Sequence, residues 1–389
     1  MVGLEVTGLG ERRVMVFTGQ VLPISQTFIA AHCAHLMRYK PTLVGLSPDN
    51  GITAFGYPSV IFNAGHKPSL LQRAEFTLGF SRRMARLIAE IKPALIHAHF
   101  ADNAALILPY ARAAGIPLVV TLHGYDVAIK MPPLRLRTQI IKSRRKAVAT
   151  QSAMVLAVSE YLRDRALAHG FSNANLKVHY LGIPIPEAPT VPAQEKAPRI
   201  IYAGRLYEKK GIDKVIAAFA EVRRSIPDAE LHVVGDGPLR PLVEAAKSEI
   251  GGIVSYGALP HAKLLEVMKT GRIFTMPSRD AKNGDYEGFG LVLLEAQALG
   301  FFVVTSNVTG TREAIMDGVT GFCIDPNDHL ALARACTGLL SDPDRCDAMG
   351  RAAIAFVREK FDIVRRTEIL EAYYDDILHP EHHAAARVK

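Results

Sequence analysis

The sequence predicts an α/β protein with two doubly wound parallel sheets in tandem. Two observations predict this class. Short, continuously apolar runs alternate with longer helical stretches along the whole chain, and one proline-rich segment interrupts this alternation near the middle. Continuous apolar strands joined by helices indicate a parallel sheet that is covered on both faces. The length of 389 residues is enough for two such domains, each with its own core.

The first half begins with a predicted strand over residues 13–18, followed by a helix over 25–39 with Ser25 as its cap. The remaining strands of this half are expected at 93–99, 117–123 and 153–159. Residues 182–198 contain five prolines and therefore form neither a helix nor a central strand. The second half has predicted strands at 199–203, 231–234, 253–256, 273–276 and 302–305.

These patterns divide the chain into four parts. We predict an N-terminal domain over 1–182, a stiff linker over 183–198, a second domain over 199–361, and a helical tail over 362–389 that packs back on one of the domains. In doubly wound folds, ligands bind beyond the carboxyl ends of the strands, where the strand order reverses. Two such domains joined by one linker are expected to bind a ligand in the cleft between them, so functional residues should follow strands directly.

Composition places the chain among ordinary globular proteins, with 49% hydrophobic and 22% charged residues. The four cysteines show no close CxxC pairing, so neither a zinc site nor a disulfide framework is expected. The first residues lack the pattern of a secretory signal, and no apolar run approaches the ~18 residues of a spanning helix. We therefore expect a cytoplasmic protein with free thiols.

The positive charge is concentrated in the first half of the chain. Residues 1–190 contain 21 basic and 10 acidic residues, whereas the remainder contains 25 basic and 28 acidic ones. The densest patch runs from Arg135 to Lys146 and reads RLRTQIIKSRRK. Such asymmetry indicates an anionic partner, either nucleic acid, anionic lipid or a phosphorylated substrate, although a solvated helix face gives the same pattern.

Basic residues follow the first strand of the second half. Gly204 and Arg205 come directly after the strand, and Lys210 stands just before the next helix. Two cations at a strand-to-helix turn suit a diphosphate, although two exposed basic residues on a turn give the same pattern. Gly235 follows the next predicted strand in a Gly-Asp-Gly turn that resembles a nucleotide-binding turn, but a tight loop explains this turn equally well.

A third segment of the second half, EGFGLVLLEAQALG, places Glu287 and Glu295 eight residues apart at the start of a predicted helix. The free amide groups of the first turn suit a phosphate, and carboxylates beside a phosphate site suit hydroxyl groups. A sugar nucleotide offers a diphosphate flanked by two hydroxyl-bearing rings. The alternative is a surface helix with two ordinary glutamates, but a plain helix gains nothing from the glycines in Gly-Phe-Gly.

In the first half, His123 ends a predicted strand and is followed by glycine, which suits entry into the cleft. A capping or core histidine is the alternative reading. His97 and His99 lie on one strand face and, with His123, suggest a metal site, but no carboxylate or thiol spacing supports one. No Asp-x-Asp ends a strand, so we expect no metal to hold the diphosphate. The Gly-x-Ser-x-Gly and Walker motifs of hydrolases and P-loop nucleotidases are missing.

Together these motifs resemble the retaining glycosyltransferases of family four, which have the GT-B fold of two Rossmann-like domains. In the second domain the resemblance rests on four segments, AGRL…KG from Ala203, PS…EGFG…EA…G from Pro277, GTREAI from Gly310 and DGVTGF from Asp317. In the first domain, PISQTFI, HAHFA and LHGYD are similar to a branch that builds exopolysaccharides such as colanic acid. That branch usually has Ser-Glu-Thr where this chain has Ser-Gln-Thr.

The resemblance implies roles for individual residues. Arg205 and Lys210 would neutralise the leaving diphosphate, Glu287 would meet the hydroxyls of the donor sugar, and Glu295 would hold the ribose. His123 would lie beside the transferred sugar. The implied donor site also includes Gly204, Gly235, Gly288, Phe289 and Gly290. The implied acceptor site includes Gly19, Ser25, Gln26, Thr27 and Asp126.

The predicted function is therefore transfer of a hexose from a UDP- or GDP-linked donor to a glycan or lipid-linked acceptor, with neither cofactor nor metal. Departure of the nucleotide diphosphate increases negative charge where the cations and helix amides are placed. The segment from Arg135 to Lys146 would hold the enzyme against anionic lipid. Two alternatives remain open, a GT-B nucleotide-sugar epimerase and a non-catalytic sugar-nucleotide-binding protein. Nucleic-acid binding lacks an aromatic platform or helix-turn-helix pattern.

Overall fold

The computed structural model describes residues 12–21, 27–48, 56–63, 69–128, 136–186 and 196–380. These residues form two compact units. Unit 1 contains residues 1–158, 163–179 and 363–389, and unit 2 contains residues 159–162 and 180–362. The chain passes from unit 1 into unit 2 at Tyr180, close to the predicted break at residue 182, and returns to unit 1 at Ile363, so the tail belongs to unit 1. Most of the predicted linker lies outside the described residues.

Unit 1 is built on a seven-stranded sheet, in which every described pairing is parallel. The strand order is β3-β2-β1-β4-β5-β6-β7. The strands are β1 (Arg13–Val21), β2 (Lys40–Pro48), β3 (Ser59–Ile61), β4 (Leu95–His99), β5 (Leu118–Leu122), β6 (Met154–Ala157) and β7 (Leu176–Val178). The order reverses between β1 and β4, so the carboxyl ends of these two strands mark the place where such a fold binds ligands.

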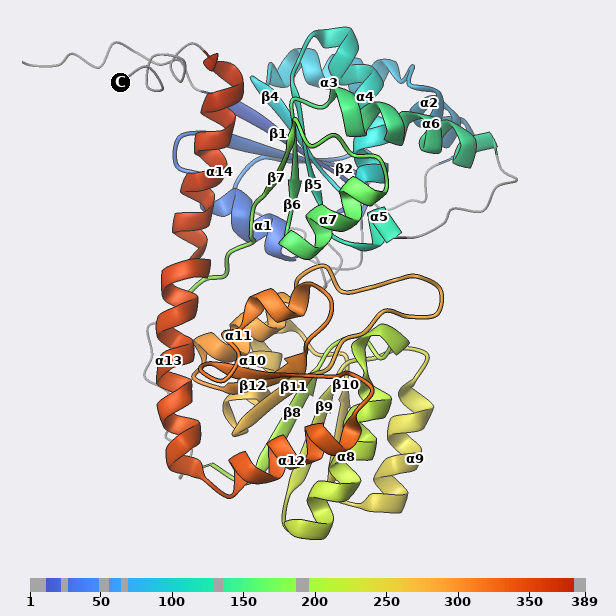
Figure 1. Ribbon diagram of the computed structural model, residues 1–389. Helices are drawn as coiled ribbons and strands as arrows, with labels where there is room; N and C mark the ends of the chain where they lie inside the picture. The colour runs from blue at the N-terminus through green and yellow to red at the C-terminus, as the bar shows by residue number, and fades with distance from the viewer. Residues whose placement is uncertain are drawn as a thin grey trace, which may run out of the picture. The chain divides into compact units, whose positions relative to one another are not determined.

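Helices cover both faces of this sheet (Figure 1). Those of unit 1 are α1 (Thr27–Ala34), α2 (Leu70–Leu78), α3 (Arg82–Ile91), α4 (Ala101–Ala114), α5 (Tyr125–Ala128), α6 (Leu136–Gln151), most of α7 (Glu160–Ala168) and α14 (Ile363–Leu378). Alternate strand residues such as Val14 and Val16 pack with Leu370 and Tyr374 of α14 in one core cluster. Helix α1 starts at Thr27, and the predicted cap Ser25 lies outside the described residues.

The C-terminal helix α14 is part of unit 1 because its buried face completes the core of that unit. The hydroxyl of Tyr374 lies 2.6 Å from Nδ1 of His97 on β4. The buried carboxylate of Glu371 accepts hydrogen bonds from the backbone amides of Met37, Arg38 and Tyr39, at the entrance to β2. Unpaired backbone amides are costly when buried, so this one carboxylate fixes the start of a strand far away in sequence.

Unit 2 has a six-stranded parallel sheet in the order β10-β9-β8-β11-β12-β13. Its strands are β8 (Arg199–Ala203), β9 (Glu230–Val234), β10 (Ile253–Gly257), β11 (Ile273–Met276), β12 (Phe302–Ser306) and β13 (Gly321–Ile324). Its helices are η3 (Glu208–Lys210), α8 (Ile212–Ser225), α9 (Arg240–Ile250), α10 (His261–Lys269), α11 (Leu291–Ala298), η4 (Gly310–Ala314), α12 (His329–Leu340) and α13 (Pro343–Phe361). In Figure 1, α8, α9 and α12 cover one face of this sheet and α10 and α11 the other.

The prediction of two doubly wound parallel sheets is confirmed. In unit 2 the strand order reverses between β8 and β11, which pair directly through Ile273 with Ile200. The predicted donor residues follow these two strands, except Gly235, which follows β9. Within the described ranges, no helix is both long and apolar enough to cross a lipid bilayer.

Candidate functional site

The carboxyl ends of β8 and β11 bring together the charged residues that the sequence singled out in unit 2. Lys210 ends η3 after β8, and Glu287 lies in the segment between β11 and α11. The ammonium group of Lys210 forms an ion pair with Oε2 of Glu287, and only 13% of the lysine side chain and 16% of the glutamate side chain are exposed. The strand order reverses at this position, where a doubly wound fold binds its ligand.

Burial and neighbouring charges set the protonation of this pair. Burial lowers the pKa of Lys210, and the charges of Lys209 and Arg205 lower it further, whereas Glu287 raises it. Burial alone would raise the pKa of Glu287, but Lys210 and Lys209 outweigh it, so the pKa lies below its ordinary value. The carboxylate of Glu287 is therefore ionised at neutral pH. A second anion at this place, such as a diphosphate, would share the same cations.

Arg205 lies at the end of β8 with an exposed side chain. Its guanidinium carbon stands 5.2 Å from the centre of the Tyr207 ring, which orients the planar group without neutralising it. An exposed guanidinium beside a buried lysine can bind phosphate oxygens in the bidentate manner that arginine favours. The predicted neighbour Gly204 is the first residue after the strand, directly before Arg205, and a Cβ atom there would stand 3.8 Å from Cδ of Lys210.

Lys209 is a buried cation that sequence reasoning missed. Its ammonium group lies 2.9 Å from Oδ1 of Asp285 and donates to the backbone carbonyl of Tyr286 at 3.2 Å, with 8% of the side chain exposed. The signal was present as two adjacent lysines facing a segment with two carboxylates, Asp285 and Glu287. Each lysine pairs with one of these carboxylates, so Lys209 fixes the segment that carries Glu287.

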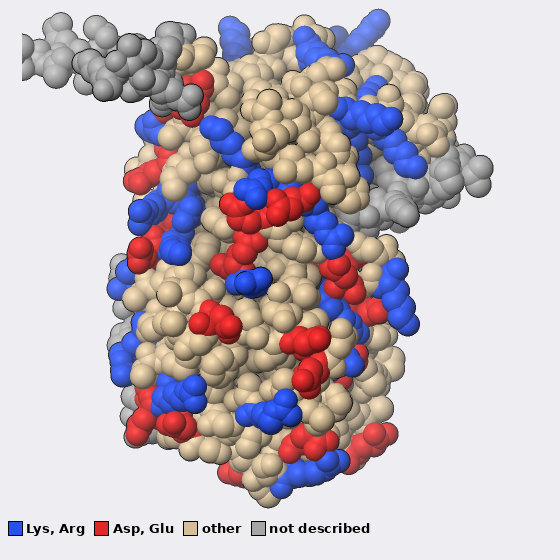
Figure 2. All heavy atoms as spheres, viewed as in Figure 1, with Lys and Arg blue, Asp and Glu red and all other residues tan. Residues whose placement is uncertain are grey.

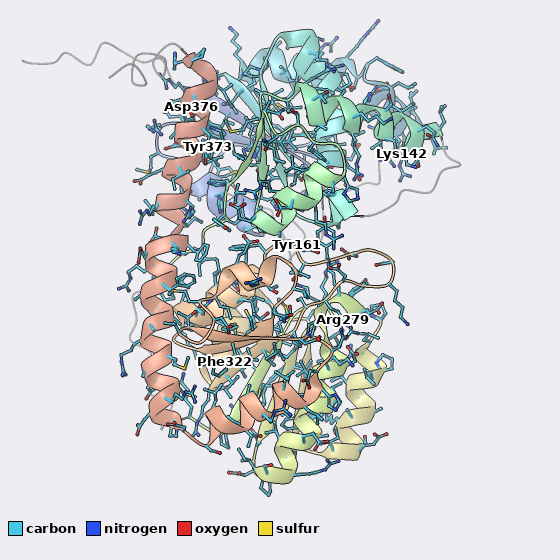
Figure 3. All side chains as sticks on the ribbon, in the orientation of Figure 1. Lys142, Tyr161, Arg279, Phe322, Tyr373 and Asp376 are labelled. Carbon is cyan, nitrogen blue, oxygen red and sulfur yellow. The ribbon has the colours of Figure 1, made fainter. Side chains whose placement is uncertain are left out.

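A second ion pair holds the beginning of this segment. Arg279, labelled in Figure 3, lies 3.0 Å from Oδ2 of Asp213 on α8, and its backbone amide donates to the carbonyl of Lys209. The polar loop over 280–286 is thus anchored at both ends by cation–carboxylate pairs. These anchors fix where the loop starts and ends, directly before Glu287.

The Gly-Phe-Gly segment leads directly into α11. Phe289 is buried, with ring centres 5.4 Å from Tyr180 and 5.5 Å from Phe361. The side chain of Phe289 thus packs in an aromatic cluster, and a donor contact at this residue stays a prediction. The backbone amides from Gly288 to Gly290 remain the groups of this segment that can meet a donor.

Glu295, two turns into α11, forms a contact that the sequence did not reveal. Its Oε1 atom lies 2.9 Å from Nε2 of His261, the first residue of α10. This hydrogen bond raises the pKa of His261. The predicted ribose-binding carboxylate therefore has a histidine partner that can hold it in place.

Gly235 has a packing reason to be glycine. Its φ of +145° lies in the region that favours glycine, and a Cβ atom there would stand 1.9 Å from the carbonyl oxygen of Gly204. The turn after β9 thus closes against the turn after β8. A donor contact at Gly235 stays a prediction, and the close backbone approach shapes the loop that carries Arg205.

Glu313, in the GTREAI segment after β12, holds other backbone segments of unit 2 in place. The carboxylate of Glu313 accepts hydrogen bonds from the backbone amides of Glu160 and Tyr161 and from the hydroxyl of Tyr180. The hydroxyl of Ser159 donates to the backbone carbonyl of Gly288 at 2.6 Å. These bonds tie residues 159–162 to the Gly-Phe-Gly segment and to η4.

In unit 1, His123 follows β5 and belongs to a stack of histidines. Its Nε2 atom lies 3.0 Å from Nδ1 of His99, and the ring of His99 stacks on that of His97 at 4.6 Å. Burial, with help from neighbouring histidines, lowers the pKa of His123 to about 3. His123 is therefore neutral at physiological pH and acts as a hydrogen-bonding group. Among the described residues, no group of three His, Cys, Asp or Glu side chains is arranged to hold a metal.

Asp126, predicted to contact the acceptor, is buried and bonded to the backbone. Its Oδ1 atom accepts from the amides of His123 and Gly124, and its Oδ2 atom accepts from the amide of Ala101 at the start of α4. Burial raises the pKa of this carboxyl. These bonds hold the loop of His123 in place, and an acceptor contact at Asp126 stays a prediction.

The other predicted acceptor residues are only partly described. Gly19 lies in β1, two residues before the strand ends at Val21, and a Cβ atom there would stand 2.5 Å from Oδ1 of Asn103 on α4. Ser25 and Gln26 lie outside the described residues, as does the side chain of Thr27. Gly19 thus lies at the edge of the sheet where the order reverses, and the acceptor roles stay predictions.

Comparison with known proteins gives two family matches that together span most of the chain. Residues 187–356 match the model "Glycosyl transferases group 1", and residues 28–186 match "Glycosyltransferase Family 4". A GDP-mannose-dependent α-(1-6)-phosphatidylinositol monomannoside mannosyltransferase of Mycolicibacterium smegmatis is 30% identical over 349 residues, covering 84% of this chain and 88% of that protein. The chain belongs to the family-four glycosyltransferases. An α-D-kanosaminyltransferase of Streptomyces kanamyceticus is 28% identical, covering 76% of this glycosyltransferase and 80% of the relative.

Solved structures with the same fold are more distant in sequence. Sucrose-phosphate synthase of Thermosynechococcus elongatus has a TM-score of 0.76 at 19% identity and covers 95% of this glycosyltransferase and 100% of that chain. HepE of Anabaena, in complex with UDP and glucose, has a TM-score of 0.74 at 18% identity, covering 94% and 99%. The expected GT-B architecture of two Rossmann-like units is thereby confirmed, and the prediction of a glycosyltransferase is confirmed by the family.

Proposed function

We propose that the enzyme transfers a hexose from a UDP- or GDP-linked donor to a glycan or lipid-linked acceptor, with retention at the anomeric carbon. The observation that carries this proposal is the buried Lys210–Glu287 ion pair beside exposed Arg205, at the reversal of strand order. The names of relatives support it, since one is a GDP-mannose-dependent mannosyltransferase and another was crystallised with UDP and glucose. The expected setting is synthesis of exopolysaccharide or another cell-surface polysaccharide.

The cations act on the leaving group. When the bond between the anomeric carbon and the phosphate oxygen breaks, negative charge grows on the diphosphate and positive charge grows on the sugar. We propose that Arg205, Lys210 and the amides from Gly288 to Gly290 stabilise the growing negative charge. In this proposal, positive side chains and helix amides stabilise the leaving diphosphate, as a divalent cation does in other enzymes. We therefore expect activity to survive a metal chelator.

The carboxylates and the histidine hold the donor. Glu287 would accept hydrogen bonds from hydroxyls of the donor sugar, and Glu295 from those of the ribose. His123, neutral at physiological pH, would meet the transferred sugar. The acceptor hydroxyl forms the new bond to the anomeric carbon and gives its proton to the departing phosphate oxygen, so the reaction balances without a protein base.

The acceptor side rests on unit 1. We propose that Gly19, Ser25, Gln26 and Thr27 contribute to the acceptor site, with Asp126 acting through the loop of His123. A lipid-linked acceptor lies at the cytoplasmic face of the membrane. The basic segment from Arg135 to Lys146, most of it on α6, is the sequence feature that suggests contact with anionic lipid.

A thermal-shift screen against nucleotide diphosphates and nucleotide sugars, with a chelator present, tests the donor site. A ligand that binds only the folded state, at ~100 times its dissociation constant, adds about 2.7 kcal/mol of stability. We expect a shift with UDP or GDP that is lost in Arg205→Ala and Glu295→Ala. Without a shift for any nucleotide, the donor site as proposed is refuted.

Product analysis then separates transfer from its alternatives. Incubation with the binding nucleotide sugar and no acceptor yields a rearranged sugar if the enzyme is an epimerase. A non-catalytic binding protein gives the thermal shift but no product with any acceptor. Transfer requires the acceptor and releases one nucleotide diphosphate for each new glycosidic bond.

A further inference from the structure

Helix α2 and Phe80, two residues after its end, expose large apolar side chains. Leu70, Leu71, Leu78 and Phe80 are between 49% and 83% exposed. Leu71 and Leu78 are seven residues apart and therefore share one face of the helix. The opposite face is fixed, because Phe76 is buried with its ring 5.3 Å from that of Phe62. The helix is thus held firmly on unit 1 while its leucines face outward.

Arginines lie directly beside these apolar side chains. A surface hollow of about 930 Å³ is lined by Val60, Phe62, Glu75, Phe80, Arg82, Arg83, Arg86, Leu87 and Glu90. Arg83 is held in place, because it donates to the backbone carbonyl of Phe62 at 2.7 Å and lies over the ring of the same residue. Arg82 and Arg86 remain exposed. Residues 70–92 carry five basic and two acidic residues in all.

Helix α6 continues the basic surface. Figure 2 shows Lys and Arg side chains on the part of unit 1 that carries α3 and α6, and Figure 3 labels Lys142 on α6. Arg144 donates to the carbonyl of Leu78 on α2, and Arg145 pairs with Asp102 on α4. These two arginines of the predicted basic patch therefore serve packing within unit 1. The predicted basic patch exposes one leucine, Leu136, whereas α2 exposes three.

We propose that the surface formed by Leu70, Leu71, Leu78, Phe80, Arg82 and Arg86, called here the α2–α3 surface, docks unit 1 on an anionic lipid membrane. This deepens the membrane part of the proposed function and moves the contact from α6 to α2 and α3. Its basis is independent of the donor site, because every residue of the surface belongs to unit 1 and follows β3.

The combination of groups selects a lipid surface as the occupant. Exposed leucines and a phenylalanine beside arginines are the composition of helices that lie in a membrane interface, with the apolar side chains among the acyl chains and the cations at the phosphates. Nucleic acid would gain little from four exposed apolar side chains. A purely apolar partner would leave Arg82 and Arg86 without counter-charges.

Flotation of the full chain with vesicles tests the proposal. The wild type should float with phosphatidylcholine vesicles that contain phosphatidylglycerol and bind far less to pure phosphatidylcholine, because the arginines need anionic headgroups. A Leu70→Ser, Leu71→Ser variant should bind about tenfold more weakly at any salt concentration, since it loses the inserted side chains. An Arg82→Gln, Arg86→Gln variant should lose the part of binding that salt weakens.

Matched controls keep the outcome decisive. Arg351→Gln with Arg358→Gln removes the same charge from exposed positions on α13, and Leu330→Ser changes an exposed leucine of α12; both should float like the wild type. Inorganic phosphate at the concentration of lipid headgroups should not displace the vesicles, which separates a membrane from a free phosphate site. Unchanged flotation of both surface variants, together with loss in a Lys142→Gln, Lys146→Gln variant, would overturn the proposal in favour of α6.

Two further outcomes also count against it. If the wild type does not float, the surface has another occupant, and sedimentation that shows a dimer lost in the leucine variant would identify a second copy of the chain. The nucleotide thermal shift is measured on the same variants. Because the α2–α3 surface lies outside the donor residues, a retained shift with lost flotation supports the membrane surface alone, and failure of the shift in the wild type speaks only against the donor site.

Discussion

The Nε2 atom of His261 lies 2.9 Å from Oε1 of Glu295, which joins the first residue of α10 to the second turn of α11. His261 comes after β10 and Glu295 after β11, and the two residues are 34 positions apart in sequence. The hydrogen bond fixes the carboxylate that we propose for the ribose. It also makes the position of that carboxylate dependent on the protonation of a histidine.

The first prediction concerns the pH dependence of stability. The hydrogen bond to Glu295 raises the pKa of His261 above 6.5, so its stabilising effect is fully present below pH 6.5 and is lost as the pH rises through the folded-state pKa. Thermal unfolding of wild type and His261→Gln should therefore differ most near about pH 5.5 and least near about pH 9. His169→Gln, at an exposed histidine bonded to a backbone carbonyl, is the control. A difference that grows with pH would contradict the assignment.

The second prediction concerns the Lys210–Glu287 ion pair. Removing one partner of a mostly buried pair leaves the other charge uncompensated, which costs roughly 3 kcal/mol. We expect Lys210→Met to lower the free energy of unfolding by about this amount, and the Lys210→Met, Glu287→Gln double variant to recover part of it. Urea unfolding measures all three proteins. Strictly additive effects of the two substitutions would show that the pair is not coupled.

The third prediction separates positioning from contact at Asp126. Asparagine can accept from the amides of His123 and Gly124, but its amino group cannot accept from Ala101, so a buried amide loses its partner. Asp126→Asn should cost about 1–3 kcal/mol of stability and lower kcat through the displaced loop of His123. The KM for the acceptor should change little.

The control for this substitution is Asp164→Asn, an exposed carboxylate paired with its neighbour Arg163, which should stay within about 0.5 kcal/mol of the wild type. A rise in the acceptor KM without loss of stability in Asp126→Asn would instead support direct contact with the acceptor.

The sequence was sufficient to predict the residues that follow strands. Arg205 and Lys210 come shortly after β8, Glu287 follows β11 after a polar loop, and Glu295 lies in the helix that comes next, while parallel strands bring their carboxyl ends to one edge of the sheet. Strands without a continuous apolar run escaped prediction. β2 contains Pro41, Gly45 and Pro48, and its place inside the sheet depends on pairing with β1 and β3.

Side-chain pairing between distant segments was not predictable. Lys209 and Asp285 are 76 residues apart, and although two lysines and two carboxylates stand in the two segments, the sequence does not show which lysine pairs with which carboxylate or that Lys209 is buried. The same holds for burial of Phe289, which depends on Tyr180 and Phe361 reaching the same place. For Asp126 the family resemblance implied a contact with the acceptor. Its three bonds to backbone amides arise only when α4 starts beside that loop.

The last prediction concerns Lys209 as a positioning residue. Lys209 pairs with Asp285 and bonds the carbonyl of Tyr286, so it holds the segment immediately before Glu287. In Lys209→Met the carboxylate of Asp285 loses its partner and the segment shifts. We expect the donor KM to rise about tenfold and the ratio of kcat/KM between two donor sugars to change, since Glu287 meets the sugar hydroxyls.

Lys282→Met is the matched control, because it removes an exposed lysine from the same loop and should leave both quantities unchanged. A purely structural role of Lys209 would lower stability while the ratio between donor sugars stays constant. The ratio is measured with two nucleotide sugars that share one base. A structural role cannot change this ratio, because a change requires the loop to discriminate between hydroxyl groups. Rescue by Lys209→Arg, which keeps the cation, would assign the effect to the charge on Asp285.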